Sequence, residues 1–452
     1  MTTSSPETPG AERSRYRYLV LFILLIVYCL SYVDRQIIGI LALPIKTDLQ
    51  LSDTQLGLMG GFAFAIFYTG AGIPIARLAD RFNRVWIISA SLTIWSGFTA
   101  VCGLATGFWS LFLARLGVGV GEAGGVAPSF SIVADYFPPR QRARAFAVLT
   151  LALPVGSAMG LFIGGVLAAQ YGWRTAFIAM GVIGVLVAPL LLFTVREPVR
   201  GRLDPAPLAA AKTRPSFIDV LSHVRRKPSF WWLSIGSAMA SMLSYGVGFW
   251  LPAFIHRSHG LELVQTSQFL SALTLFGGVI GILAGGWLGD LLGARHKAAY
   301  ALVPAAAFLI GFPFLLVGLS LSSLPIVFAV LMVPQAASVL WTGPSVAAIQ
   351  QLAPATMRAT ASSIYLFITN LIGLGVGTFV FGAVSDILTA RFGDNALQYS
   401  IMACAVVLYP LAILFYWLAS RSLTRDWEGA AVAPPVSLTP GLRRRRSEPA
   451  GR

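Results

Sequence analysis

Four ionisable residues stand inside long apolar runs of the sequence. Asp34 and Arg35 lie in the run 18–44, and Arg115 and Glu122 lie in the run 109–135. Charged side chains at bilayer depth are unfavourable and usually face a cavity or a partner of opposite charge. Two carboxyls that take up and release protons, with two guanidiniums as alternating ion-pair partners, are the minimum set of groups that could couple transport to protonation. A buried pair that only ties two helices together is the alternative, and it stays open for Asp34 and Arg35.

The positions of these residues along their helices suggest which of them can meet. With a rise of about 1.5 Å per residue, Asp34 lies roughly 24 Å from a helix start near Tyr18, and Arg115 lies roughly 10 Å from an opposite start near Phe108. In a hydrocarbon core about 30 Å thick, both fall in the same half, so Arg115 could pair with Asp34. Glu122 is two helical turns beyond Arg115 and nearly on the same face, so it lies deeper.

The elements that position these residues are membrane-spanning helices. Of the 452 residues, 56% are hydrophobic and only 11% are charged, whereas a soluble domain carries roughly a quarter charged residues. The apolar runs are continuous and long enough to cross a bilayer as helices, and they do not alternate as barrel strands would. We predict an all-α integral membrane protein with spans at 18–44, 54–76, 85–105, 109–135, 143–169, 175–195, 230–255, 266–289, 298–319, 325–351, 359–385 and 396–419.

The net charge of +15 follows from topology. With both termini in the cytoplasm, 27 of the 33 basic residues fall on the cytoplasmic side, and the opposite side holds only Lys46, Arg174, Arg257 and Arg391. This asymmetry obeys the positive-inside rule, and we do not expect nucleic-acid binding. The four arginines at 443–446 suit contact with lipid headgroups. Many Arg and Ala with few Lys indicate a GC-rich bacterial genome, so we predict a multi-pass protein of the inner membrane.

A polar, proline-containing connection divides six spans from six. We therefore expect a cytoplasmic N-terminal tail (1–17), a six-helix bundle (18–195), a cytoplasmic linker (196–229), a second six-helix bundle (230–419) and a basic cytoplasmic tail (420–452). The halves share a pattern, because Pro128 and Arg142 recur at the same spacing as Pro344 and Arg358. We call the step in numbering from Pro128 to Pro344 the repeat shift. Weak internal repeats of this kind are typical of secondary transporters, whose binding site lies between the repeats near the middle of the membrane.

The sequence offers little for catalysis. The four His lie at span ends or in loops, and the three Cys lie in apolar spans without metal or redox spacing. A GxGxxG pattern at 119–124 falls inside a membrane helix rather than after a strand, and a nucleotide-binding P-loop is missing. We expect a protein that is not an enzyme and that requires no cofactor or metal.

Several motifs resemble those of a known family. The stretch Ala-Arg-Leu-Ala-Asp-Arg-Phe-Asn-Arg at 76–84 resembles the loop signature G-x-L-A-D-R-x-G-R of the major facilitator superfamily, and 285–290 repeats it more loosely. The segment 115–121 resembles the fourth-helix arginine motif associated with proton coupling. Within the superfamily, Tyr-Val-Asp-Arg at 32–35, Leu-Ser-Asp-Thr-Gln-Leu-Gly at 51–57 and Gly-Glu-Ala at 121–123 with Pro128 resemble the Spinster group.

This resemblance implies twelve helices in two pseudo-symmetric six-helix bundles around a central cavity that opens alternately to the two sides. It also implies a cytoplasmic gate in which Arg81 meets Asp135, while Asp80 and Asp290 lie near the starts of helices eleven and five. The residues of this expected gate are Asp80, Arg81, Arg84, Asp135, Arg142, Asp290 and Arg358. The alternative is that these loop charges only set the topology.

The resulting prediction is a proton-coupled secondary transporter that moves an amphipathic, lipid-like molecule such as a lysolipid or sphingoid lipid. Its cavity would hold Asp34, Arg35, Arg115 and Glu122. The positions aligned with the last two in the second half are uncharged, so that half could accommodate an acyl chain. Protons and membrane lipids are the other expected partners, and we expect a functional monomer. A carrier of small organic anions and a non-transporting membrane sensor of the same fold are the alternatives.

Overall fold

The structure is a computed structural model of the chain and describes residues 9–200, 203, 216–354 and 357–427. Side chains are described from residue 15 on within these ranges, apart from those of Ile73, Ala76, Asp80, Pro139 and Ala143. Part of the predicted linker and most of the predicted C-terminal tail, with its arginines at 443–446, lie outside the described residues.

The first half consists of helices, and several spans are broken into consecutive segments. In chain order they are α1 (Pro9–Ile40), α2 (Ala42–Leu49), α3 (Asp53–Gly57), the π-helical turn η1 (Leu58–Phe62), α4 (Ala63–Arg81), α5 (Arg84–Cys102), α6 (Phe108–Glu122), α7 (Val126–Tyr136), α8 (Pro139–Thr150), α9 (Ala152–Tyr171) and α10 (Trp173–Thr194).

The second half is built in the same way. It contains α11 (Phe217–Arg225), α12 (Pro228–His259), α13 (Leu263–Gly293), α14 (Ala299–Ser320), α15 (Leu324–Leu340), α16 (Thr342–Gln351), α17 (Arg358–Ile368), the π-helical segment η2 (Thr369–Val376), α18 (Gly377–Phe392), the 3₁₀ turn η3 (Gly393–Asn395) and α19 (Ala396–Asp426). Across the described residues, the regular structure is helical throughout.

The twelve predicted spans are confirmed. Eleven stretches are long and apolar enough to cross a membrane, and the last of them, Arg358–Asp426, contains two spans separated by η3. The α11 helix inside the predicted linker was not predicted. Its sequence signal is a capping box, in which Ser216 Oγ accepts from Asp219 N and the Asp219 carboxylate accepts from Ser216 N.

The break in the fourth span follows from its local sequence. The segment α6 ends at Glu122, and α7 starts four residues later after Gly124 and Gly125. Pro128 has no N–H to donate to the carbonyl of Gly124, and glycine adds little helix propensity at the same place. The break places Glu122 at the end of a helix segment, in the middle of the span.

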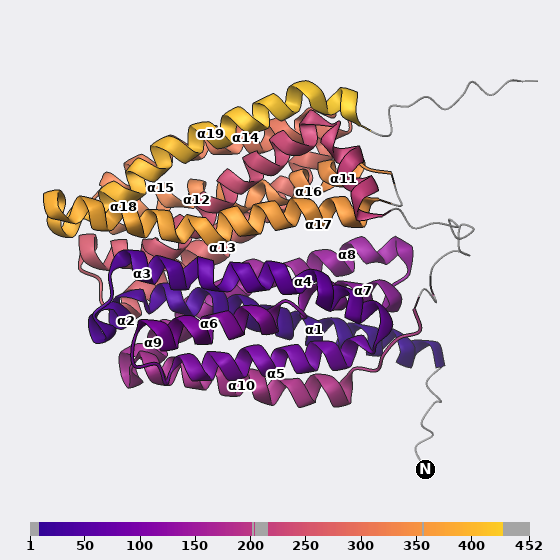
Figure 1. Cartoon of the computed structure of the whole chain (residues 1–452), viewed down its shortest axis with the longest axis horizontal. Coiled ribbons are helices and arrows are strands. Elements are labelled where there is room, and N and C mark those ends of the chain that lie inside the picture. The colour runs from indigo at the N-terminus through magenta and orange to yellow at the C-terminus, as the bar shows by residue number, and fades with distance from the viewer. Residues whose placement is uncertain (1–8, 201–202, 204–215, 355–356, 428–452) are drawn as a thin grey trace, which may run out of the picture.

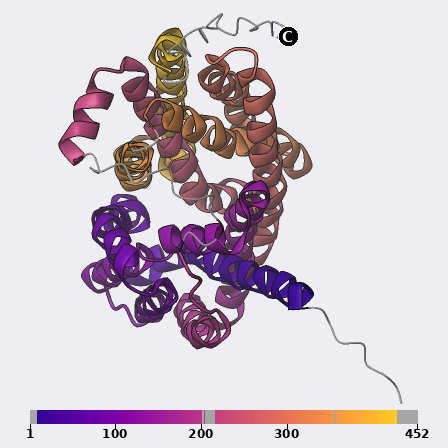
Figure 2. The same ribbon diagram turned by 90° about the vertical axis from the view of Figure 1, so that its right-hand side faces the viewer.

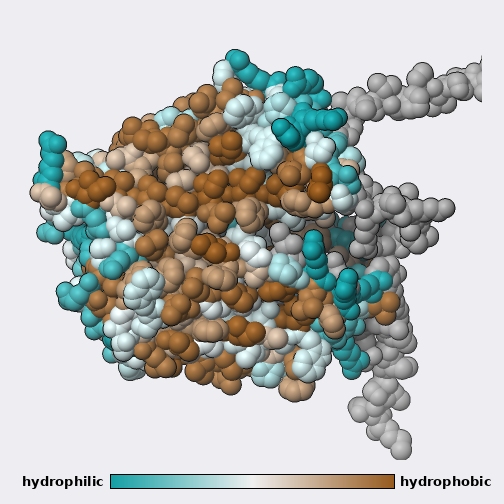
Figure 3. All heavy atoms as spheres, in the orientation of Figure 1, coloured by the Kyte–Doolittle hydropathy of each residue, from teal (hydrophilic) through white to brown (hydrophobic). Residues whose placement is uncertain are grey.

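The two halves form separate bundles that lie side by side. In Figure 1 the first half, drawn from indigo to magenta, lies below the second half, drawn from pink to yellow, and Figure 2 shows the same division from another side. We call the end where α1 begins and α19 ends the linker end, since α11 also lies there, and we call the opposite end the far end. Between the two ends, Figure 3 shows an almost continuous apolar surface, as expected for a protein surrounded by lipid.

The internal repeat seen in the sequence has a structural counterpart. Arg142 Nε donates to the carbonyl of Phe137 over 3.0 Å, and Arg358 Nε donates to the carbonyl of Ala353 over 3.2 Å. Donors and acceptors are both related by the repeat shift. The same shift relates the break between α6 and α7 to the break at Trp341, between α15 and α16.

Candidate functional site

Glu122 and Arg35 form a buried ion pair between α6 and α1. Glu122 is 0% exposed, and the side chain of Arg35 is 8% exposed. Arg35 Nε donates to Glu122 Oε1 over 2.6 Å, and Arg35 Nη2 forms an ion pair with the same oxygen. Ser31, one turn before Arg35, donates its hydroxyl to this oxygen as well, over 2.5 Å. The neighbouring guanidinium and hydroxyl compensate the loss of water around the carboxylate.

Aromatic rings enclose the guanidinium of Arg35. Its Cζ lies 5.1 Å from the ring centroid of Tyr32, 5.0 Å from that of Phe64 and 4.7 Å from that of Tyr68. Phe64 and Tyr68 are one turn apart on α4 and stack with their centroids 5.0 Å apart. A desolvated cation–π contact contributes about 2 kcal/mol. The rings and the carboxylate together fix the position of Arg35.

Arg115 and Asp34 meet through the main chain. Both are buried, with 1% and 4% of their surface exposed. Arg115 Nη1 donates to the main-chain carbonyl of Asp34 over 3.4 Å, and Arg115 Nε donates to that of Met59 over 3.5 Å. The Asp34 carboxylate lies beside Trp95 and Thr99 of α5 and within electrostatic reach of Arg115. The four residues singled out in the sequence therefore come together, with Arg35–Glu122 as the direct ion pair.

A cavity of about 140 Å³ lies between the two halves. Tyr32, Gln36 and Ser157 line it from the first half, and Tyr245 and Gln335 line it from the second. A smaller pocket, of about 30 Å³, is lined by Gln36 and Tyr245 as well as by Arg35 and Arg115. The cavity and the pocket beside Arg35 and Arg115 therefore share residues of their walls. We call Asp34, Arg35, Arg115 and Glu122 the charged cluster, and this cluster lies at the edge of the cavity.

A second pocket, of about 30 Å³, lies inside the second half. Leu251 and Gln335 line both this pocket and the central cavity, and Phe308, Leu315 and Leu331 complete its apolar wall. We call it the apolar pocket. Its apolar wall lies next to the cavity.

The repeat shift also relates the apolar pocket to the charged cluster. Under this shift Arg35 corresponds to Leu251, Arg115 to Leu331 and Glu122 to Ser338, and all three second-half residues line the apolar pocket. Equivalent places in the two bundles are thus charged in the first half and uncharged in the second.

At the far end, a polar network around Asp53 joins the halves. Asp53 is 1% exposed, and its Oδ1 accepts from Lys46 Nζ over 2.5 Å and from Arg257 Nη2 over 3.2 Å. Ser385 of the second half donates to Asp53 Oδ2 over 2.8 Å. Lys46 belongs to the same half as Asp53, whereas Arg257 and Ser385 belong to the second half, so two of these contacts cross the boundary.

Asp386 of α18 completes this network by capping the start of the second span. Its carboxylate accepts from Asp53 N over 3.1 Å, from Thr54 N over 2.8 Å and from Thr54 Oγ1 over 2.5 Å. A carboxylate at a helix N-terminus satisfies free N–H groups and interacts favourably with the helix dipole. Here the cap comes from the other half of the chain. We call the contacts of Asp53 and Asp386 the far-end network.

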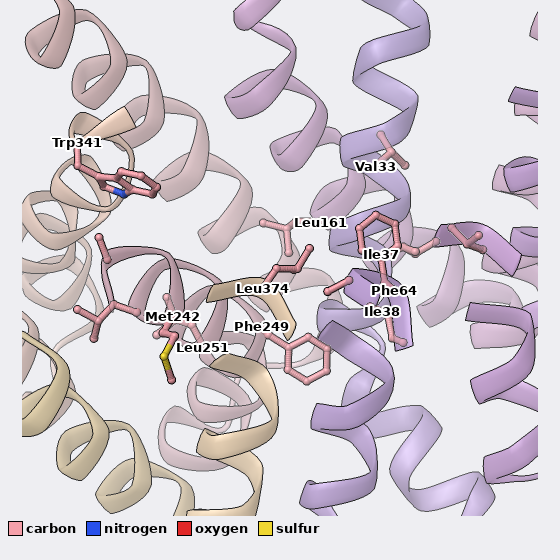
Figure 4. Packing of buried hydrophobic residues seen from close by; sticks show 14 of the residues in the cluster. Val33, Ile37, Ile38, Phe64, Leu161, Met242, Phe249, Leu251, Trp341 and Leu374 are labelled. Atoms are coloured by element: carbon pink, nitrogen blue, oxygen red, sulfur yellow. The ribbon is translucent and has the colours of Figure 1, made fainter. Parts of the chain in front are cut away.

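Glycines allow the second and eleventh spans to touch at the same end. A Cβ on Gly57 would lie 2.5 Å from the carbonyl oxygen of Thr378, and one on Gly61 would overlap that of Leu374. Thr378 Oγ1 donates to the carbonyl of Gly57 over 2.7 Å. Figure 4 shows Leu374 and Phe249 close together where the bundles meet. Backbone contact and the far-end network together join the two bundles at the far end.

At the linker end, Arg84 is the centre of a buried network within the first half. Its Nη1 pairs with Asp135 over 2.6 Å and donates to Ser131 over 2.7 Å, and its Nε pairs with Glu197 over 2.7 Å. Glu197 Oε2 also accepts from Arg84 N over 2.9 Å and so caps α5. The resemblance implied Arg81 as the partner of Asp135. In the structure Asp135 forms an ion pair with Arg84, and Arg81 is exposed.

The other residues of the expected gate lie on separate elements. Arg142 and Arg358 each donate to a main-chain carbonyl of their own half, and Asp290 is exposed on α13. The side chain of Asp80 lies outside the described residues. Their joint action as a gate remains a prediction.

Sequence reasoning missed the aromatic enclosure of Arg35 and the far-end network. Helical spacing offered a signal for the first, because Ser31 precedes Arg35 by four residues and Phe64 precedes Tyr68 by four. For the second, the signal was the rarity of basic residues on the far side. Lys46 and Arg257, two of the four there, both contact Asp53.

Comparison with known proteins identifies the family. The model of the Major Facilitator Superfamily matches residues 24–374. The chain belongs to this superfamily. An MFS-type efflux pump of Mycolicibacterium smegmatis is 36% identical over 422 residues, which cover 93% of this chain and 97% of the pump. The sphingosine-1-phosphate transporter SPNS2 of Danio rerio is 26% identical over 436 residues, which cover 90% of this chain and 86% of SPNS2.

Solved structures place the transporter within the Spinster group. A bacterial homologue of the human lysosomal transporter Spinster, crystallised in an inward-facing and unoccupied conformation, matches with a TM-score of 0.83 and 31% identity. The match covers 94% of this chain and 99% of that one. The occupied inward-facing form of the homologue matches with a TM-score of 0.79. The predicted resemblance, the two-bundle fold and the assignment as a Spinster-type membrane transporter are therefore confirmed.

Proposed function

We propose that this transporter couples the movement of an amphipathic, lipid-like molecule to the movement of protons. One observation carries the proposal: the charged cluster around Arg35 and Glu122 and the apolar pocket both adjoin one cavity. A molecule with an anionic or zwitterionic head and a hydrocarbon tail satisfies both. A small organic anion would leave the apolar pocket unused.

Proton coupling rests on the ion pair between Arg35 and Glu122. Protonation of Glu122 removes its negative charge, so Arg35 loses its partner and becomes available to an anionic group of the substrate. Arg35 is close enough to the cavity for this exchange, since the pocket that it lines shares Gln36 and Tyr245 with the cavity. Asp34 and Arg115 lie next to the pair and adjust to the change in charge.

Alternating access rests on the asymmetry of the contacts between the halves. The far-end network and the glycine contacts join the bundles at one end. With both termini in the cytoplasm, as the distribution of basic residues favours, the structure corresponds to an inward-facing state. The match to an inward-facing bacterial Spinster homologue supports this assignment. The proposed location is a bacterial inner membrane, and the efflux pump among the relatives supports outward transport.

The test combines binding with transport. The purified transporter is screened by thermal shift against lysophosphatidylcholine, sphingosine, sphingosine-1-phosphate and citrate, and hits are assayed in proteoliposomes under an imposed pH gradient. We expect a lysolipid or sphingoid lipid to stabilise the protein and its transport to respond to the gradient. A shift with citrate alone would favour the organic-anion carrier.

Glu122→Gln is the decisive variant for proton coupling. We expect it to abolish gradient-driven transport while retaining substrate exchange without a gradient. Glu262→Gln is the matched control, because Glu262 is exposed at the far end. Unchanged dependence on the gradient in Glu122→Gln would refute the proton role of this residue.

A further inference from the structure

The helix α11 at the linker end carries apolar side chains on two of its sides. Val220 and Val224 are buried, because α11 packs against α12 and α17. Phe217, Ile218 and Leu221 are exposed, by 53%, 75% and 36%. Large apolar side chains that are exposed together, rather than scattered singly, mark a surface for a partner that excludes water.

The helical repeat of about 3.6 residues divides α11 into three sides. The buried valines form the first side. Phe217, Leu221 and Arg225 are spaced by four and share the second side, with Ile218 next to them. The third side carries exposed polar residues at spacings of three and four, namely Asp219, Ser222 and Arg226. A helix with one side on its own protein, one apolar side with a basic end and one polar side suits a place where protein, lipid and water meet.

The position of α11 in the fold is such a place. The helix ends at Arg225, and α12 begins at Pro228, so α11 lies at the level where the seventh span starts. Figure 2 faces the linker end and shows α11, drawn in pink, at the outer edge of the second bundle. Around a membrane protein, the outer edge at the end of a span is the headgroup region of the bilayer.

The protein itself holds α11 at this level. Lys227 Nζ donates to the main-chain carbonyl of Asp426 over 2.9 Å, and Ser229 Oγ donates to the Asp426 carboxylate over 2.7 Å. These contacts fix the joint between α11 and α12 against the end of α19. A tethered segment meets its partner at a high effective concentration, so a helix of only nine residues is sufficient for contact with a bilayer.

The charges of α11 favour anionic lipid. Arg225 and Arg226 are exposed at its end, whereas the carboxylate of Asp219 lies on the polar side and caps the start of the helix. An anionic leaflet raises the affinity of each basic residue near its surface by about fivefold. The basic end of the apolar side therefore matches the phosphates of lipids that carry a net negative charge.

We propose that α11 is a membrane-surface helix that recognises an anionic leaflet. Phe217, Ile218 and Leu221 insert among the acyl chains at the linker end, and Arg225 binds the lipid phosphates. With both termini in the cytoplasm, this is the inner leaflet. Because α12 follows directly and lines the central cavity through Tyr245, the contact positions a cavity-lining span relative to the bilayer. The inference does not depend on proton coupling.

The experiment locates two sides of α11 in a bilayer with a fluorescent label. The full-length transporter, with its three buried native cysteines replaced by serine, carries a nitrobenzoxadiazole label at Ile218→Cys or, as the matched control on the polar side, at Ser222→Cys. Each form is reconstituted into nanodiscs of phosphatidylethanolamine with phosphatidylglycerol, or of phosphatidylcholine alone. Doxyl-labelled lipid quenches a label among acyl chains, and iodide quenches a label in water. Size-exclusion profiles identify any variant that fails to fold.

We expect the label at position 218 to be quenched by doxyl lipid and shielded from iodide in the anionic nanodiscs, and the label at position 222 to show the reverse. Arg225→Gln should lower the ratio of lipid-quenched to iodide-quenched label at position 218 by about fivefold in anionic nanodiscs, the factor for one basic residue, and should have no effect in phosphatidylcholine. Arg391→Gln removes an exposed basic residue at the far end and should change neither.

Two results would overturn the proposal. Equal access of iodide to both labels in both bilayers would refute the position at the membrane surface and would leave the apolar side of α11 to a protein partner. A label at position 218 that contacts lipid equally in both bilayers and in Arg225→Gln would refute the recognition of anionic lipid.

Discussion

Replacing Asp386 by alanine should open the transporter at the far end. The Asp386 carboxylate accepts three hydrogen bonds from the start of the second span, two of them from the backbone N–H groups of Asp53 and Thr54. A hydrogen bond to a charged group contributes about 1.5–3 kcal/mol. In the variant, water can form some of the lost hydrogen bonds and recover part of their free energy, because Thr54 and Asp386 are only half-buried. A net loss of about 2 kcal/mol shifts the ratio of closed to open forms roughly 30-fold.

Double electron–electron resonance measures this shift directly. Spin labels at Gln50→Cys and Asn395→Cys report the separation of the halves, because both residues are at the far end, on different halves, and Asn395 is exposed. The three native cysteines are buried and can be replaced by serine. We expect a longer distance to gain population in Asp386→Ala.

The matched control is Asp48→Ala. Asp48 pairs with Arg174 over 2.6 Å at the same end, but both residues belong to the first half. Loss of this pair should leave the distance distribution unchanged. Identical distributions for Asp386→Ala and the unmodified protein would show that the far-end network does not hold the halves together.

Three further predictions concern the charged cluster, the linker end and the apolar pocket. Arg35→Lys loses the planar guanidinium that both the carboxylate and the aromatic rings contact, so affinity for an anionic lipid in a binding titration should fall about tenfold. Arg84→Ala removes the buried guanidinium that contacts both Asp135 and Glu197, so the protein in detergent should lose about 3 kcal/mol of stability and unfold at a lower temperature. Arg81→Ala should leave the unfolding temperature unchanged. Val247→Phe places a larger side chain in the apolar pocket, so it should weaken the binding of long-chain lysolipids relative to short-chain ones by about tenfold. This factor is equivalent to about two buried methylene groups. Equal weakening for all chain lengths would contradict the assignment of the pocket.

The spans and the repeat were predictable because they depend on composition over many residues. A run of about 20 apolar residues forms a helix in lipid whatever its neighbours are, since backbone N–H and C=O groups must be satisfied internally. The repeat shift, read from Pro128 and Pro344, reappears in the helix breaks and in the contacts of Arg142 and Arg358. Features that extend over a whole span can thus be predicted from the sequence alone.

The partners within the charged cluster were harder to predict because they depend on the direction of single side chains. The depth estimate correctly placed Arg115 near Asp34, but it could not show that the guanidinium reaches the main-chain carbonyl rather than the carboxylate. The far-end network joins Asp53 to residues more than 200 positions away. Such a contact depends on the angle between the bundles, which no local pattern in the sequence encodes.

In the proposed mechanism, the division of chemistry between the halves is the reason why coupling requires both of them. Arg35, Arg115 and Glu122 have uncharged counterparts, among them Leu251 and Ser338, in the same place of the second bundle. Protonation of Glu122 therefore changes the charge of the first bundle alone, whereas the apolar pocket contains no charged side chain that would respond to it. A substrate that occupies the cavity and the pocket together contacts the charged cluster of one bundle and the apolar wall of the other. Under the proposed function, such a molecule transmits the change in charge at Glu122 to the relative position of the two bundles, and this link distinguishes coupled transport from a proton leak.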